Sequence, residues 1–358
     1  MVSFLPDVDR FNMNLFPGLL LLVYCVLATA TASAQLDDAP KAKFVLPDNQ
    51  SRVQQIDAAS QWLVDQVKHG TLEWNETSCE VDVIAWYDPT LEPGNFQLLA
   101  GYLQTDSVWA AKALQLRRPE TATSLSATLT RLDAWDNGLQ EVLFYPIPRI
   151  KHRVNDADRV HGTKIGTVTV GEQKKVEVRT FEFIEDPAFT VGHSRDFAEH
   201  TAYQALFEFW TGDHQAARRR LRHVFKPRAT VTIDDPVYWD SGRQLLIDRG
   251  IFEEWQSEQV KTIGQFPIKL GTMLYAMRLT GTAKEFPDAV VALERRLWQC
   301  QLEESDSRPG FRDAGGVAHF IQVSADGQVR RGKGATGEAT AIAILASTVQ
   351  EFSGKVGD

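Results

Sequence analysis

Apolar residues recur at helical spacing in three pairs of segments along this chain. In each pair, a strongly apolar segment is followed by a short turn and then by a more polar segment. The pairs are 95–103 with 107–116, 197–210 with 214–225, and 264–279 with 286–302. This spacing predicts two helices joined as a hairpin, and several such hairpins are needed to bury a shared core. Segments 55–67 and 121–132 show the same period and predict two further helices.

The last predicted helix, 337–346, has a different composition. Apart from the Gly337-Glu338 pair at its start, it is almost wholly small and apolar. A helix that is apolar on all sides is buried on all sides. A soluble chain can bury such a helix when an inner ring of helices is wrapped by an outer ring. The pattern therefore predicts a mainly α fold, an α/α toroid of helical hairpins.

A stretch of different character interrupts the hairpins at about 141–185. It is rich in Val, Thr, Ile and Phe, and residues 176–183 alternate between apolar and polar side chains. The dipeptide Gly171-Glu172 lies between two such runs. This pattern predicts a small inserted β-hairpin or sheet, which we expect at one rim of the toroid, where it would shape the opening.

The N-terminus has the features of an export signal. Residues 16–30 are apolar, and Ala32-Ser33-Ala34 matches the small-residue pattern before a signal-peptidase site. We therefore expect a signal peptide at 1–34, a linker at 35–50 and a single toroid domain at 51–358. The mature protein would be secreted and extracellular, with no membrane attachment once the signal is removed. An uncleaved anchor is the alternative, because the residues before the apolar run are weakly charged.

Cysteines, sequons and net charge refine this expectation. Cys25 would leave with the signal, so Cys79 and Cys300 form either one disulfide or two buried free thiols. Asn49 and Asn75 begin glycosylation sequons, which suit an exported glycoprotein. The formal net charge of −9 argues against nucleic acid and against an anionic membrane surface as partners. The basic run 218–223 is interpreted as a solvated helix face.

The hairpin order from about residue 85 to 350, with Gly315-Gly316 and the later Gly337-Glu338-Ala-Thr-Ala run, resembles the α/α-toroid families. These families include six-hairpin glycosidases, α/α-barrel polysaccharide lyases and terpenoid-cyclase-like toroids. The resemblance is one of fold. It implies a central funnel lined by the N-terminal turns of the inner helices, and no motif transfers a catalytic residue from any one family.

The expected funnel carries polar residues whose types suit carbohydrate chemistry. A glycoside hydrolase needs two carboxylates across the scissile bond. The N-terminus of a helix favours anionic groups. The candidate catalytic residues are Asp88, Asp235, Asp240 and Glu338. The candidate substrate-binding residues are Asn95, His200, Tyr203, Tyr238, Trp239, Lys269 and His319, and Glu199 occupies the same helix turn as His200. Each of these residues also suits a purely structural role as a cap, turn or core residue.

Three functions stay open at this stage. The preferred one is a secreted glycoside hydrolase that acts on carbohydrate or another extracellular small molecule. A polysaccharide lyase would use His200 or Tyr203 as base and Lys269 to neutralise a uronate. A non-catalytic binding or scaffold protein is the third. No phosphate-binding loop, nucleophile elbow, dinucleotide fingerprint or standard zinc spacing is present, so we expect no cofactor and no metal.

Overall fold

Helices and small antiparallel sheets together form the part of the chain that the structure describes. The computed structural model describes residues 42–74, 77–84, 100–131, 152–153, 164–170, 174–179, 183–184, 198–210, 212–232, 234–248, 262–324, 326–332 and 334–351. All of them lie within one compact unit, Lys41–Asp358. The expected signal peptide and the start of the expected linker lie outside these residues.

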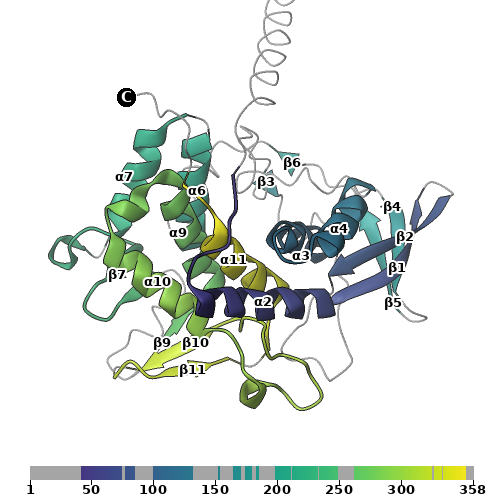
Figure 1. Ribbon diagram of the computed structural model, residues 1–358. Helices are drawn as coiled ribbons and strands as arrows, with labels where there is room; N and C mark the ends of the chain where they lie inside the picture. Colours follow the sequence, from purple (N-terminus) through teal and green to yellow (C-terminus); the bar gives the residue numbers. More distant parts are fainter. Residues whose placement is uncertain are drawn as a thin grey trace, which may run out of the picture. The chain divides into compact units, whose positions relative to one another are not determined.

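The first predicted hairpin is wrong, because one continuous helix runs from residue 100 to residue 114 through both of its segments, 95–103 and 107–116. The short polar break between those segments contains no Gly or Pro that would end a helix. The main helices otherwise follow the predicted segments. They are α2 (Gln50–Asp65), α3 (Ala100–Leu114), α4 (Pro119–Arg131), α6 (Ala198–Trp210), α7 (His214–Val224), α9 (Pro267–Thr280), α10 (Pro287–Gln299) and α11 (Gly337–Thr348). Consecutive helices pack as pairs, α3 with α4, α6 with α7, and α9 with α10 (Figure 1). Short 3-10 turns occupy Arg228–Thr230, Thr282–Lys284 and Glu304–Asp306.

The strands overturn the mainly α prediction, because the described fold is mixed α/β and not a toroid of helices. One sheet has the order β2-β1-β4-β5, from Thr77–Ile84, Val67–Trp74, Lys164–Val170 and Lys174–Arg179. A second has the order β11-β10-β9, from Val329–Arg331, Ile321–Ser324 and Thr262–Gln265. Two-stranded ladders join β7 (Val237–Asp240) to β8 (Leu245–Asp248), and β3 (His152–Arg153) to β6 (Phe183–Ile184).

The first sheet explains why the prediction failed. Strands β4 and β5 fall within the expected insertion and pair with each other, but β4 also pairs with β1. Strand β1 pairs in turn with β2, with Val67 opposite Ile84. The strand signal in β2 is short and only partly alternating, because its buried residues are Val81, Val83 and Ile84, at the end of the strand. A sheet that reaches from residue 67 to residue 179 is therefore part of the fold and not an isolated insertion.

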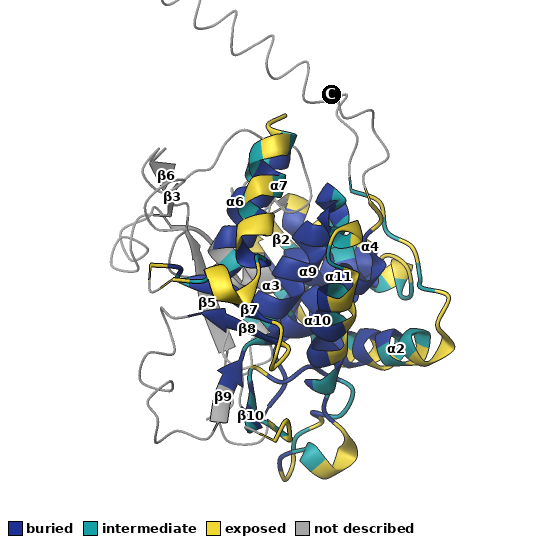
Figure 2. Cartoon of the chain, turned by 90° about the vertical axis from the view of Figure 1, so that its left-hand side faces the viewer, coloured by how far each residue is buried: buried dark blue, intermediate teal, exposed yellow. Residues whose placement is uncertain are grey.

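Helices α9 and α11 form the buried centre of the described helices. Nearly every residue of both is buried, as Figure 2 shows. A Cβ added at Gly271 of α9 would lie 2.8 Å from Cγ1 of Ile342 in α11, so the two helices are in close contact there. Two turns further along α9, Nη1 of Arg278 donates to the carbonyl oxygen of Ala346 at the far end of α11. Contacts that advance in the same direction on both helices mean that α9 and α11 are parallel.

Helix α6 is parallel to α9 as well. The two helices pack against each other, and Arg218, near the start of α7, the helix that directly follows α6, donates to the carbonyl oxygen of Thr280 at the end of α9. At the opposite end, the backbone N–H of Ala198 and the ammonium of Lys269 both donate to Oδ2 of Asp248. The N-terminal turns of α6, α9 and α11 therefore lie at the same end of the helix group.

Residues 42–50, the described part of the expected linker, contact the end of α11. Phe44 forms a β-bridge with Val349, and the N–H of Val45 donates to the carbonyl oxygen of Thr348. Asn49 then caps α2 by accepting from the N–H groups of Ser51 and Arg52. This segment is held by backbone hydrogen bonds and does not behave as a free tether.

Candidate functional site

The N-terminal turns of the three parallel helices bring together the most informative polar side chains. We call this region the helix rim and define it by Glu199 and Tyr203 of α6, Lys269 of α9, Glu338 of α11, and Asp248 at the end of β8. The first N–H groups of a helix have no partner within the helix, and they favour negative charge nearby. Three parallel helix starts therefore suit carboxylates at this end.

Tyr203 is the central side chain of the rim. Its ring is buried, with 8% of its surface exposed, and it meets Trp109 edge-on with ring centroids 6.5 Å apart. Burial raises the pKa of the Tyr203 phenol well above its ordinary value, and the negative charges of Glu338 and then Glu199 raise it further. The carboxylates of Glu338 and Glu199 are therefore both close enough to one phenol to act on its charge, although they come from different helices.

Lys269 does not serve as an open cationic site. Its Nζ lies 2.6 Å from Oδ2 of Asp248, and the two side chains are 7% and 2% exposed. The same Oδ2 atom accepts from the N–H of Ala198 at 2.8 Å, so Asp248 also supplies an acceptor to the start of α6. Oδ1 of Asp248 is buried and has no hydrogen-bond partner within the described chain. The sequence analysis missed Asp248, although an Asp directly after a buried Leu-Leu-Ile run was a usable signal.

An aromatic group lies beside Lys269. The ring of Phe266, the residue before α9, has the Lys269 ammonium 5.6 Å from its centroid. His319 meets Phe266 edge-on at 5.4 Å between centroids, and Phe320 lies 6.2 Å from Phe266. The His319 ring is exposed, while Phe266 and Phe320 are half-buried. His319 was expected at the rim, and the two phenylalanines were not.

Asp240 lies away from the helix rim and organises a turn. Its Oδ1 accepts from the N–H groups of Gly242 and Arg243, and its Oδ2 lies 2.8 Å from Nη2 of Arg243. Burial alone would raise the pKa of this carboxyl, but the hydrogen bonds and charge of Arg243 outweigh burial and lower it. In the β7–β8 ladder Asp240 is opposite Leu245, whereas Asp248 is opposite Val237 at the other end. At about 3.4 Å per residue the two ends are roughly 10 Å apart.

Asp235 is also held in a structural role. Its carboxylate accepts from Nζ of Lys226 at 2.7 and 2.8 Å and from the N–H of Thr232 at 2.6 Å. Nε2 of His223 lies 2.7 Å from the same carboxylate. The Lys226 ammonium is the largest cause of a strongly lowered pKa for Asp235, followed by the Thr232 N–H. This carboxylate is ionised and fully occupied, which does not suit an acid or a nucleophile.

Tyr238 and Trp239 are core residues of β7. Both are buried, with the Tyr238 ring under the guanidinium of Arg228 at 4.8 Å and the Trp239 ring 6.0 Å from that of Phe225. Buried rings give no surface on which a sugar can stack. Asp88 and Asn95 lie outside the described residues, as does Asn75. His200 belongs to α6, but its side chain is not described.

The described residues contain no group of three or more His, Cys, Asp or Glu side chains that suits a metal ion. Within the same ranges, no helix combines the length and apolar character needed to cross a membrane. Cys79 and Cys300 are both free thiols, so the disulfide between them is not formed. Comparison of the chain with protein-family models, curated proteins and solved structures finds no match.

Proposed function

We propose that the chain is an extracellular carbohydrate-active enzyme that hydrolyses a glycosidic bond at the helix rim, with Glu338 and Glu199 as its two carboxylates. The observation that carries the proposal is that Glu199 and Glu338, both partly exposed, lie in the first turns of two parallel helices whose N-terminal turns are at the same end of the helix group. A pair of carboxylates that different helices bring to one end suits the two carboxyl groups that glycoside hydrolysis needs. Glu338 was a predicted catalytic residue, and Glu199 replaces Asp240 and Asp235 as its partner.

The chemistry divides between the two carboxylates and the phenol. One carboxyl group protonates the leaving oxygen, while the other acts as base towards water or as nucleophile towards the anomeric carbon. Tyr203 stays protonated at neutral pH because its pKa is raised. Its O–H therefore donates a hydrogen bond and does not act as a base.

The lyase alternative fits the contacts less well. A lyase needs a base, and the raised pKa of Tyr203 makes its phenolate scarce. It also needs a cation for the uronate carboxylate, but the ammonium of Lys269 is buried against Asp248. Tyr203 and Lys269 are therefore engaged in other roles, and the side chain of His200, the other candidate base, is not described.

The aromatic group of Phe266, His319 and Phe320 supports a carbohydrate as the substrate. It lies beside Lys269 at the start of α9, next to the rim, and its His319 ring is exposed. Apolar faces of sugars pack on aromatic rings, while their hydroxyls reach polar groups nearby. The predicted export signal would add an extracellular location, where polysaccharides are abundant substrates.

The test is a matched set of glutamate variants assayed on neutral and uronate polysaccharides. Reducing ends and the absorbance of unsaturated products are followed in parallel. We expect reducing ends without that absorbance. Glu338→Gln and Glu199→Gln should each lower the rate by about 10²- to 10⁴-fold. Glu120→Gln, a change of the same kind at an exposed position of α4, should leave it unchanged.

Three outcomes would contradict the proposal. Reducing ends that appear equally with both active-site variants would place the chemistry elsewhere. Retained binding of a polysaccharide without any product would favour the non-catalytic binding protein, and the unsaturated product would favour the lyase.

A further inference from the structure

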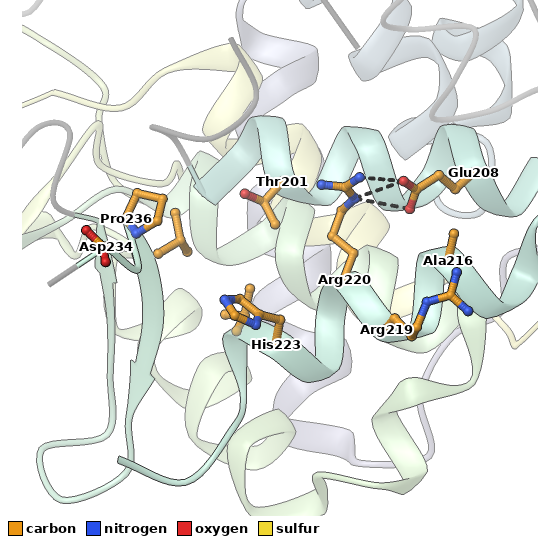
Figure 3. Close-up of a pocket in the computed structure, with 10 residues that line it drawn as sticks. Thr201, Glu208, Ala216, Arg219, Arg220, His223, Asp234 and Pro236 are labelled. Atoms are coloured by element: carbon orange, nitrogen blue, oxygen red, sulfur yellow. Dashed lines mark hydrogen bonds and ion pairs between the residues drawn. The ribbon is translucent and has the colours of Figure 1, made fainter. Parts of the chain in front are cut away.

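A second region of the chain forms a cavity of about 610 Å³ between α6, α7 and the segment that enters β7. Its polar lining residues are Thr201 and Glu208 of α6, Arg219, Arg220 and His223 of α7, and Asp234 before β7 (Figure 3). This volume is in the range of small-molecule sites, which run from about 300 to 1,000 Å³.

The cavity is separate from the helix rim. An α-helix turns by about 100° per residue. Thr201 and Glu208 therefore lie about 200° and 180° around α6 from Glu199, on the side opposite Glu199 and Tyr203. A molecule in the cavity and a molecule at the rim would occupy opposite faces of the same helix. Binding of a molecule in the cavity is therefore independent of the proposed hydrolysis at the helix rim.

The arginines of α7 differ in how they are bonded. Arg218 donates to the carbonyl oxygen of Thr280, and Arg222 forms a two-point contact with Glu285. Arg220 forms a similar pair with Glu208 inside the cavity, drawn as dashed lines in Figure 3. Arg219 is exposed, lines the cavity and has no hydrogen bond or ion pair with any described residue.

Two further groups shape the cavity wall. His223 is oriented by its Nε2 contact with Asp235 at 2.7 Å, and Lys226 holds the same carboxylate. Asp234 lies on the opposite side of the cavity from Arg219, as Figure 3 shows, and its side chain is exposed. The cavity therefore has Arg219 at one end, Asp234 at the other, and Thr201 between them in its lining.

We infer that this cavity binds a small hydroxylated anion, with its anionic group on the guanidinium of Arg219 and its hydroxyls towards Asp234. A free guanidinium binds carboxylate, sulfate or phosphate oxygens in a two-point contact, and a carboxylate accepts from hydroxyls. A uronic acid and a sugar sulfate share this chemistry. On a chain whose net charge is −9, an unpaired guanidinium in a cavity is the feature that selects such an anion.

The test is isothermal titration calorimetry of the full chain with D-glucuronate, D-glucose 6-sulfate and D-glucose. Two variants are compared, Arg219→Gln in the cavity and Arg330→Gln as its control. Arg330 is exposed on β11 and, like Arg219, has no ion pair within the described ranges, so the control removes the same charge at a site remote in the chain.

We expect at least one of the two anions to bind, and glucose to bind about tenfold more weakly or not at all. Arg219→Gln should raise the Kd of that anion by about tenfold or more, and Arg330→Gln should leave it within about twofold. The anion with the lower Kd shows whether the cavity prefers a carboxylate or a sulfate. Binding of glucose as tight as that of the anions, an unchanged Kd in Arg219→Gln, or no binding of either anion would overturn the inference. Glu338→Gln should bind the anion normally, which separates this result from the outcome of the hydrolysis assay.

Discussion

Lys269 and Asp248 form a buried ion pair at the start of two parallel helices. Nζ of Lys269 lies 2.6 Å from Oδ2 of Asp248, and that oxygen also accepts from the first N–H of α6. One carboxylate therefore joins the end of strand β8 to the starts of α6 and α9. The pair fixes where the helix starts lie, and with them the positions of the groups at the helix rim.

Replacing Lys269 with Met should destabilise the protein strongly. The change leaves the Asp248 carboxylate buried without its cation, and breaking a buried pair costs about 3–5 kcal/mol. Lys284→Met is the control, since Lys284 is 75% exposed and its pair with Glu351 contributes at most about 1 kcal/mol. Urea unfolding measures both. The double variant Lys269→Met/Asp248→Leu should recover much of the loss, and equal effects of the two lysine variants would contradict the structural role.

Tyr203 should keep its proton in alkaline solution after exposed tyrosines have lost theirs. Its pKa is raised by burial first and then by Glu338 and Glu199, whereas exposed tyrosines ionise near about pH 10. Ring-labelled tyrosine NMR should show late titrations for Tyr203 and for the wholly buried Tyr275, whose pKa is also raised by burial, and only the first should be absent in Tyr203→Phe. Glu338→Gln should lower the pKa of Tyr203, because it removes a nearby negative charge, but burial should keep the pKa above that of exposed tyrosines. Titration of Tyr203 with the exposed tyrosines would contradict the arrangement at the rim.

The same raised pKa has a consequence for stability. The folded-state pKa of Tyr203 exceeds the unfolded one, so its contribution is fully present below about pH 10 and is lost as the pH rises through the folded-state pKa. The stability of Tyr203→Phe should therefore fall less steeply with rising pH than that of the wild type above about pH 10. Thermal unfolding across the alkaline range provides the measurement.

Local periodicity predicted most of the helices, although it divided the single helix α3 into two segments. Segment 214–225 predicted α7, and the apolar composition of 337–346 predicted the full burial of α11, where Ile342 and Leu345 are wholly inside. These features depend on residues close together in the sequence, where the helical period is directly visible.

The sheets and the roles of the acidic residues were much less predictable. Strand β1 acquires its partner β4 from almost a hundred positions away, and no local pattern encodes that pairing. Asp240 and Glu338 look equivalent in the sequence. They differ in their partners. Asp240 is bonded by Arg243 within a turn, whereas Glu338 of α11 raises the pKa of Tyr203, which belongs to another helix, α6. Which partner a charged side chain meets depends on tertiary packing, so the sequence could nominate carboxylates but could not rank them.

Asp240 and Asp235 should affect acid stability and not catalysis. Both carboxyls have lowered pKa values in the folded state. Their stabilising contribution is present above the unfolded pKa of about 3.9 and is lost as the pH falls through the lower folded-state values. Asp240→Asn and Asp235→Asn should therefore lower stability at pH 7 and flatten its decline below about pH 4. Chemical unfolding from neutral to acidic pH checks this.

The hydrolysis assay separates the two interpretations of these residues. Correctly folded Asp240→Asn and Asp235→Asn should retain the wild-type rate at temperatures where they stay folded. A folded variant that loses its activity would return that aspartate to the catalytic set.

Cys79 and Cys300 should differ sharply in reactivity. Cys300 is wholly buried, its thiol donates to the carbonyl oxygen of Arg296 at 3.2 Å, and burial raises its pKa. Cys79 is half-buried on β2. Because the thiolate is the reactive form, Cys79 should react with a thiol reagent in the native protein and Cys300 only after unfolding. The Cys300→Ser variant assigns the slow step, and simultaneous labelling of both thiols would contradict the burial of Cys300.

The contact between α9 and α11 leaves no space for a methyl group at Gly271. Alanine usually stabilises a helix over glycine by about 0.5–1 kcal/mol. Here, however, the added Cβ would lie 2.8 Å from Cγ1 and 2.9 Å from Cγ2 of Ile342. We therefore expect Gly271→Ala to destabilise by about 1–3 kcal/mol, as overpacking does in other cores.

A double-mutant cycle isolates this steric cause. Ile342→Ala alone should cost about 2–5 kcal/mol through the cavity that it leaves. The double variant Gly271→Ala/Ile342→Ala should be more stable than the sum of the single effects predicts, because the new methyl group then fills the space left by Ile342. Urea unfolding of the four proteins gives the coupling energy. Strictly additive effects would mean that α9 and α11 are not in contact at this position, which would also remove the basis for placing Glu338 beside Tyr203.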